Sequence, residues 1–159
     1  MLKIGAISVG AVVLVLSVML FGVHSSALGD INDKKKEMET RIMHEDEVAN
    51  VVYFDHHYGD EMTANALVDL QDSQQEVWMF NESYERFDRI AADQFITKEQ
   101  AWSVVEEEAS SIDEQRGVTL GLLDGAYVYE VIYIDEEDGH IYHYVDAESG
   151  STNQVLRLP

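Results

Sequence analysis

The chain has 159 residues, of which 31 are Asp or Glu and 10 are Lys or Arg, so its formal net charge at pH 7 is −21. A surface this acidic repels nucleic acid phosphates and anionic lipid headgroups, which excludes nucleic acid as a partner. The absence of Cys excludes disulfides, a thiol nucleophile and a lipidated cysteine, so a folded domain is held by its apolar core alone.

An uncharged apolar stretch near the start predicts a membrane anchor. Residues 4–23 match the roughly 20 residues that cross a bilayer core as a helix, and we assign residues 1–29 to this anchor. A cleavable signal peptide is the alternative, although its apolar region is usually only about 7–15 residues long. Lys3 and the short tail before the span favour a cytoplasmic N-terminus, while Lys34 to Lys36 after the span count the other way. We expect a single-pass protein of the cell membrane whose acidic part is extracytoplasmic.

Residues 30–91 are expected to form a helix, which is either part of a first small unit or a stalk that leaves the membrane, and a first small sheet. The stretch 30–50 lacks Gly and Pro, and a narrow apolar stripe recurs in it at helical spacing. Strand candidates follow at 48–54, 64–70, 76–80 and 84–90.

Residues 92–159 carry the clearest structural signals. Thr97, with Gln100 three residues later, has the spacing of a capping box and predicts a helix over 97–109. The pair Asp124-Gly125 lies between two apolar runs and is the strongest short-range signal of a β-hairpin. Further turns at 138–139 and 148–150 divide the remaining chain into strands over 127–134, 141–146 and 155–158.

A weak internal repeat appears at an offset of 65 residues. Residues 77–81 fall on 142–146, and the earlier helix falls approximately on the later one. The match is one of pattern more than identity. It predicts an α+β fold with two tandem small units, each a helix packed on an antiparallel sheet.

Three motifs of the second unit resemble those of a PepSY domain. They are Ile96-Thr97-Lys98-Glu99-Gln100-Ala101 on the helix, Tyr129-Glu130-Val131 on a strand, and Tyr144-Val145-Asp146-Ala147-Glu148-Ser149-Gly150 at a turn, with Ser149 where Thr is usual. With the anchor and the first unit, the chain resembles the TseB-like proteins of Gram-positive bacteria, which are described as regulators of cell-wall elongation. The resemblance covers 48–159 and is strongest from Thr97 onward. It implies a cystatin-like fold in each unit, no enzymatic activity, and association with a cell-wall transpeptidase of the penicillin-binding class.

The densest group of possible metal ligands is the pair His56-His57 with Asp55, Asp60 and Glu61. Adjacent side chains of an extended strand point to opposite faces, so the two imidazoles do not converge on one ion unless the chain curls. A polar loop that breaks the strand accounts for the same composition.

The remaining ionisable residues give no catalytic pattern either. His140 and His143 face opposite ways on a strand, and residues 135–138 lack the ligand spacing and the Gly of a calcium loop. No Ser lies in a nucleophile-elbow setting, and carboxylates are too numerous for any pair to mark a hydrolase. We therefore expect no enzymatic activity, no cofactor, no metal site and no small-molecule substrate.

Three functions are consistent with these features. The first is a non-catalytic, membrane-anchored interaction module that regulates cell-wall synthesis through a penicillin-binding protein. The second is a PepSY-type inhibitory or chaperone-like module for a secreted peptidase. The third is an acidic ectodomain that binds cations or glycans. Identifying the protein that the chain captures in intact cells separates them.

The central strand of the second unit is the candidate partner-contact element. Its two faces carry Tyr127, Tyr129, Val131 and Tyr133 on one side, and Val128, Glu130, Ile132 and Ile134 on the other. Both faces are largely apolar, whereas one helix covers only one of them. Either the first unit packs on the second face, or the tyrosines simply tolerate half-exposure, or part of the row formed by Tyr127, Tyr129 and Tyr133 is an exposed contact patch. Tyr suits such a patch because it provides a large area and a hydroxyl with little loss of entropy.

Overall fold

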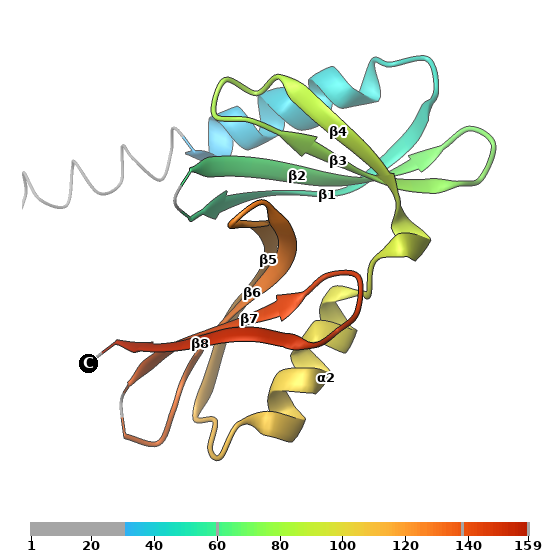
Figure 1. Ribbon diagram of the computed structural model, residues 1–159. Helices are drawn as coiled ribbons and strands as arrows, with labels where there is room; N and C mark the ends of the chain where they lie inside the picture. Colours follow the sequence, from blue (N-terminus) through green and yellow to red (C-terminus); the bar gives the residue numbers. More distant parts are fainter. Residues whose placement is uncertain (1–30, 60, 138, 159) are drawn as a thin grey trace, which may run out of the picture. The chain divides into compact units, whose positions relative to one another are not determined.

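The computed structural model describes residues 31–59, 61–137 and 139–158 (Figure 1). The predicted anchor at 4–23 lies outside the described residues, and no helix within the described part is both long and apolar enough to cross a membrane. The chain divides into two compact units after Met38, and both sheets belong to the second unit, residues 39–159.

The described chain is α+β, with two antiparallel four-stranded sheets and few helices. A helix over residues 31–43 precedes the first sheet, which contains β1 (Val48–Tyr58), β2 (Met62–Leu70), β3 (Gln75–Phe80) and β4 (Arg86–Ala91). The short 3-10 helix η1 (Ala92–Gln94) leads to the helix α2 (Lys98–Glu108). The second sheet contains β5 (Glu114–Leu123), β6 (Ala126–Ile134), β7 (His140–Asp146) and β8 (Thr152–Leu158). In each sheet the strands lie side by side in sequence order.

The order of elements confirms the internal repeat. A helix followed by a four-stranded meander occurs twice, and the offset of 65 residues brings the helix at 31–43 onto α2 and each strand of the first sheet onto its counterpart in the second. Where one unit would end and the other begin, at residue 91 or elsewhere, remains a prediction.

The local signals of the second half form as predicted. The Thr97 hydroxyl accepts a hydrogen bond from the Gln100 backbone N–H, and the Gln100 side chain accepts one from the Thr97 N–H, which makes the capping box. Asp124 and Gly125 both have positive φ, 52° and 81°, as a type I′ hairpin turn requires. These two devices fix where α2 begins and where β5 turns into β6.

Two boundaries in the first half differ from the sequence prediction. The helix ends at residue 43 rather than near 50, because β1 already begins at Val48. The stretch 55–58 was expected to be a polar loop, and this was wrong: β1 continues through it, with His56 paired to Ala64 and His57 to Thr63 of β2. A strand accommodates this polar run because alternate side chains point to opposite faces.

The main apolar core crosses from the first sheet into the second. Val77, Met79 and Ile90 of β3 and β4 pack in one cluster with residues of α2 and the second sheet. The other buried members are Phe95, Ala101, Val105, Leu120, Tyr129, Val131, Tyr133, Ile141, Val145 and Ala147. The two sheets of residues 39–159 therefore share a core.

Candidate functional site

The helix α2 covers one face of the second sheet (Figure 1). On this face, Ala101 and Val105 of the helix are buried in the core cluster with Tyr129, Val131 and Tyr133 of β6. The outer side of α2 carries exposed glutamates, as the sequence predicts for its solvent side.

The predicted tyrosine row lies on this covered face. Tyr129 is 3% exposed and Tyr133 is 5% exposed, and the Tyr129 hydroxyl donates to the Ile96 carbonyl. Burial, together with the charge of Glu99, raises the pKa of Tyr129 to about 12. Tyr129 and Tyr133 are thus core residues in this structure and offer little surface to a partner.

Tyr127, at the start of the same row, is partly buried and joins the two sheets. Its hydroxyl donates to the carboxylate of Asp88 in β4. Burial, this hydrogen bond and the charge of Asp88 all raise the pKa of the phenol. The row therefore lies on the face that α2 covers, and within the described chain Tyr129 and Tyr133 pack in the core while Tyr127 contacts β4.

The first half of the opposite face is covered by β1. Here Val128 and Glu130 of β6 are buried, and the fully buried His57 ring lies against Gly121 of β5. The Nε2 atom of His57 is 3.7 Å from Glu130 Oε2, while the Tyr144 hydroxyl donates to the same carboxylate at 2.8 Å. This contact between the sheets is polar.

The second half of the opposite face is an apolar surface that no described element buries. Two cross-strand rows form it: Ile132, Tyr142 and Leu156 are register neighbours, and so are Ile134, His140 and Leu158. Leu156 is 41% exposed and Leu158 is 50% exposed, whereas Ile132, Ile134 and Tyr142 are half-buried. We call the apolar residues Ile132, Ile134, Tyr142, Leu156 and Leu158 the rear patch.

The rear patch is extended at one side by Gly117 of β5. Gly117 is the register neighbour of Ile132, and a Cβ atom added to it would meet nothing within 4 Å. The flank of Ile132 is therefore open. Exposed apolar surface of this kind, rimmed by polar groups, is typical of protein interaction sites.

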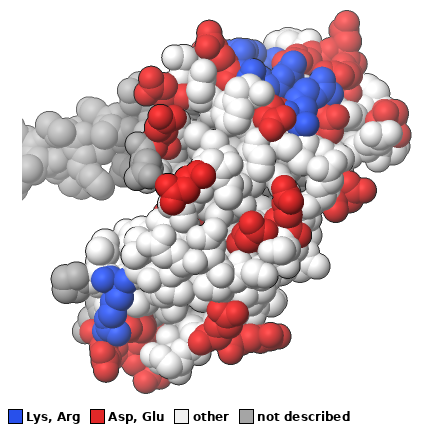
Figure 2. Space-filling model, in the orientation of Figure 1, with Lys and Arg blue, Asp and Glu red and all other residues white. Residues whose placement is uncertain are grey.

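At the other side, the rear patch ends in the edge strand β8. Every residue of β8 except Thr152 is exposed, and no described strand pairs with its outer edge. In the view of Figure 2, acidic side chains are spread over the surface and basic ones gather in small groups. Arg157 of β8 is paired with Asp135 at 2.6 Å and Glu137 at 2.9 Å.

The histidines singled out in the sequence lie apart. His56 Nε2 is 2.9 Å from the Tyr84 hydroxyl, and His57 faces Glu130 on the other side of β1. His143 is buried beside Thr152 and Glu108, whereas His140 is exposed. Among the described residues, no group of three or more possible metal ligands occurs.

The acidic hairpin at 135–138 has a structural role in its described part. Asp135 Oδ1 accepts hydrogen bonds from the N–H groups of Glu137 and Gly139, and its other oxygen pairs with Arg157. Asp138 lies outside the described residues.

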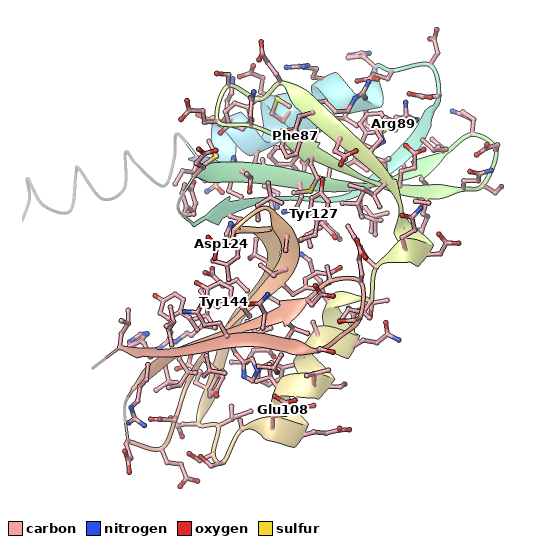
Figure 3. All side chains as sticks on the ribbon, in the orientation of Figure 1. Phe87, Arg89, Glu108, Asp124, Tyr127 and Tyr144 are labelled. Carbon is pink, nitrogen blue, oxygen red and sulfur yellow. The ribbon has the colours of Figure 1, made fainter. Side chains whose placement is uncertain are left out.

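Trp78 is fully buried, so it is not a platform for a sugar ring. Its indole N–H donates to Glu76, and the guanidinium carbons of Arg86 and Arg89 lie 4.1 and 4.9 Å from the centre of its ring. These contacts link β3 and β4 of the first sheet (Arg89 in Figure 3).

The sequence prediction missed the rear patch because its members come from three strands. The alternation of side chains along a strand showed that Ile132 and Ile134 share a face. Whether Leu156 and Leu158 lie beside them depends on the register between β7 and β8. The available signal was the run Val155-Leu156-Arg157-Leu158, which is apolar on both faces of a strand.

Comparison with known proteins gives a fold and no family. No family model matches the chain, and no curated protein matches its sequence. The solved structure of the YpmB protein from Bacillus subtilis aligns with a TM-score of 0.61 at 16% identity, over 79% of this chain and 96% of that one. A candidate lipoprotein from Clostridium difficile aligns with a TM-score of 0.39 at 12% identity, over 85% of this chain and 92% of that one. The chain therefore shares the fold of the YpmB protein.

Proposed function

We propose that this chain is a non-catalytic interaction module, held on the outer side of the cell membrane by the anchor predicted at 4–23. In this proposal it regulates cell-wall elongation by binding a transpeptidase of the penicillin-binding class through the rear patch. It takes no cofactor and no small-molecule substrate, and its two repeats are cystatin-like, the second of the PepSY kind.

The observation that carries the proposal is the uncovered rear patch. The protein has a net charge of −21, yet five apolar side chains of three neighbouring strands remain partly exposed together. Burying such a surface against a partner is favourable by roughly 25 cal/mol per Å² of apolar area. The rear patch therefore favours a protein partner over a cation or a glycan.

The class of partner comes from the PepSY-like motifs. In the structure they lie at the start of α2, in the middle of β6 and at the β7–β8 turn. The fold shared with the YpmB protein is compatible with a TseB-like assignment.

The test is crosslinking from the patch in intact cells that express the full chain. A photoreactive amino acid at Leu156 should crosslink to a penicillin-binding transpeptidase. The same group at Phe87 is the control: its exposure is similar, 46%, but it lies on β4 and not in the rear patch, so it should give no such adduct (Figure 3). Capture of a secreted peptidase from position 156 would instead support the inhibitory module. Absence of any protein adduct at 156 would refute the proposal.

A further inference from the structure

The edge strand β8 differs from the other strands in the side chains that it carries. Each of the other seven strands in the described part of the chain carries at least one Asp or Glu, whereas β8, Thr152–Leu158, carries none and exposes Val155, Leu156 and Leu158. Proteins usually protect an edge strand with charges, Pro or a bulge, because its unpaired N–H and C=O groups otherwise pair with another chain. The one charge of β8 is Arg157, which is paired with Asp135 and Glu137, and its one register shift against β7 lies at its start, between Tyr144 and Val145 of β7. From Val155 onward, the outer edge of β8 therefore has neither an acidic side chain nor a bulge.

The two faces of β8 specify what a ninth strand would meet. On the rear face, Leu156 and Leu158 continue the rear patch, so alternate residues of an added strand would pack on apolar surface. On the α2 face, the exposed residues Val155 and Arg157 lie beside His143 and Ile141 of β7.

Carboxylates stand at both ends of the α2 face. Glu108, at the end of α2, accepts a hydrogen bond from Thr152, and its side chain is 49% exposed (Figure 3). Burial lowers the pKa of the adjacent His143 despite the opposing charge of Glu108, so a neutral imidazole leaves this carboxylate unbalanced. At the other end, Asp135 and Glu137 share the single guanidinium of Arg157. Each end therefore keeps an excess of negative charge.

We propose that the outer edge of β8 receives an extended segment of the partner as a ninth strand, with apolar residues over the rear patch and basic residues over the α2 face. Backbone hydrogen bonds to β8 hold the segment, and the alternating side chains select it. This inference rests on the proposed function, because it states how the partner engages the same surface.

Charge argues against a second copy of the chain as the occupant. Another copy would bring a further formal charge of −21, and like charges oppose close approach. A basic segment is attracted by the same field.

The test uses a short synthetic peptide of alternating Val and Lys with blocked ends, and the full chain in mild non-ionic detergent. Fluorescence anisotropy should show saturable binding, and amide hydrogen exchange should slow in β8. Two control peptides carry N-methyl groups at the odd or at the even residues, so each keeps the charge but loses half of the backbone donors. The version that lacks the donors facing β8 should bind at least about tenfold more weakly than the unmethylated peptide.

Leu156→Glu separates strand addition from simple charge attraction. Loss of the apolar contact should weaken peptide binding about tenfold, whereas attraction to charge alone would make an added carboxylate strengthen it. Phe87→Glu adds the same charge on another edge strand and should leave binding unchanged. Stronger binding to the Leu156→Glu variant, or no slowing of exchange in β8, would overturn the inference.

Two further outcomes identify which proposal fails. Light scattering that shows a dimer of the full chain, lost in Leu156→Glu, would make a second copy the occupant and overturn this inference. Crosslinking of a transpeptidase from position 156 without any peptide binding would leave the proposed function standing and remove the ninth strand. Peptide binding at β8 without transpeptidase capture would leave the ninth strand standing and remove the transpeptidase as the partner.

Discussion

At the residue scale, the contacts between the two sheets depend on glycine. The His57 ring of β1 occupies the space beside Gly121 of β5, and a Cβ atom on Gly121 would lie 2.1 Å from His57 Nδ1. Nearby, the Asn65 side chain donates to the Leu120 carbonyl at 2.7 Å. The close approach of β1 to β5 therefore requires the absence of a side chain at position 121.

Gly121→Ala should destabilise the protein because the added methyl group displaces a buried ring. Overpacking of this kind typically lowers the free energy of unfolding by about 1–3 kcal/mol, which urea denaturation measures. Gly117→Ala is the matched control, since it lies on the same face of β5 with open space around it, and its effect should stay within about 0.5 kcal/mol. Equal losses in the two variants would contradict this account.

The carboxylate of Glu130 predicts a pH dependence. Burial raises its pKa, but the His57 ring and the hydrogen bond from Tyr144 lower it by more, so the pKa lies below the usual 4.5. A group whose pKa is depressed on folding stabilises the folded state above its unfolded pKa, and this contribution disappears as the pH falls through the folded value. The stabilising effect of Glu130 is therefore present at pH 7 and lost in acid.

Glu130→Gln should be less stable than the native chain at pH 7, and the difference should shrink as the pH falls below about 4.5. Melting temperatures across this range measure it. Glu106→Gln, on the exposed side of α2, should follow the native curve throughout. A constant gap between Glu130→Gln and the native chain would show that the ionised form of Glu130 contributes nothing.

At the element scale, α2 is held by two features: the core contacts of its buried residues Ala101 and Val105, and the capping box at its start. Thr97→Ala removes the side-chain acceptor for the Gln100 N–H and should lower the free energy of unfolding by about 1 kcal/mol. Thr97→Ser keeps the acceptor and should retain most of the stability. An unchanged midpoint of denaturation for Thr97→Ala would mean that the cap is replaced by water without loss.

Elements with local signals could be predicted from the sequence. The start of α2 depends on Thr97 and Gln100 alone, and the β5–β6 turn depends on Asp124 and Gly125, so neighbouring residues suffice to identify them. The repeat was visible for the same reason, because it copies the order of short apolar and polar runs.

Features that depend on register could not be predicted in this way. The sequence 55–58 reads as a loop until its pairing with β2 is known, and the rear patch exists only because β7 aligns Leu156 with Tyr142. The tyrosine row was identified as a face, but its cover comes from β4, η1 and α2, which are separated in the chain from β6 by the whole of β5.

At the scale of the whole molecule, the shared core predicts that the second repeat is weaker alone. A fragment over residues 93–159 keeps its cap, its hairpin and its own sheet and should still unfold cooperatively. It lacks Val77, Met79 and Ile90, so it should melt about 10 °C or more below residues 39–159. Calorimetry of the two fragments measures this, and equal melting temperatures would mean that the sheets fold independently.

The most direct test of the central claim is capture of the partner from native membranes by the tagged full chain, read with labelled penicillin. Penicillin marks penicillin-binding transpeptidases, so the readout is specific for the proposed class of partner. The native chain and Phe87→Glu should co-purify a labelled protein, and Leu156→Glu should lose most of it, because a carboxylate at position 156 disrupts the rear patch. Equal capture by Leu156→Glu, or no labelled protein with the native chain, would contradict the account.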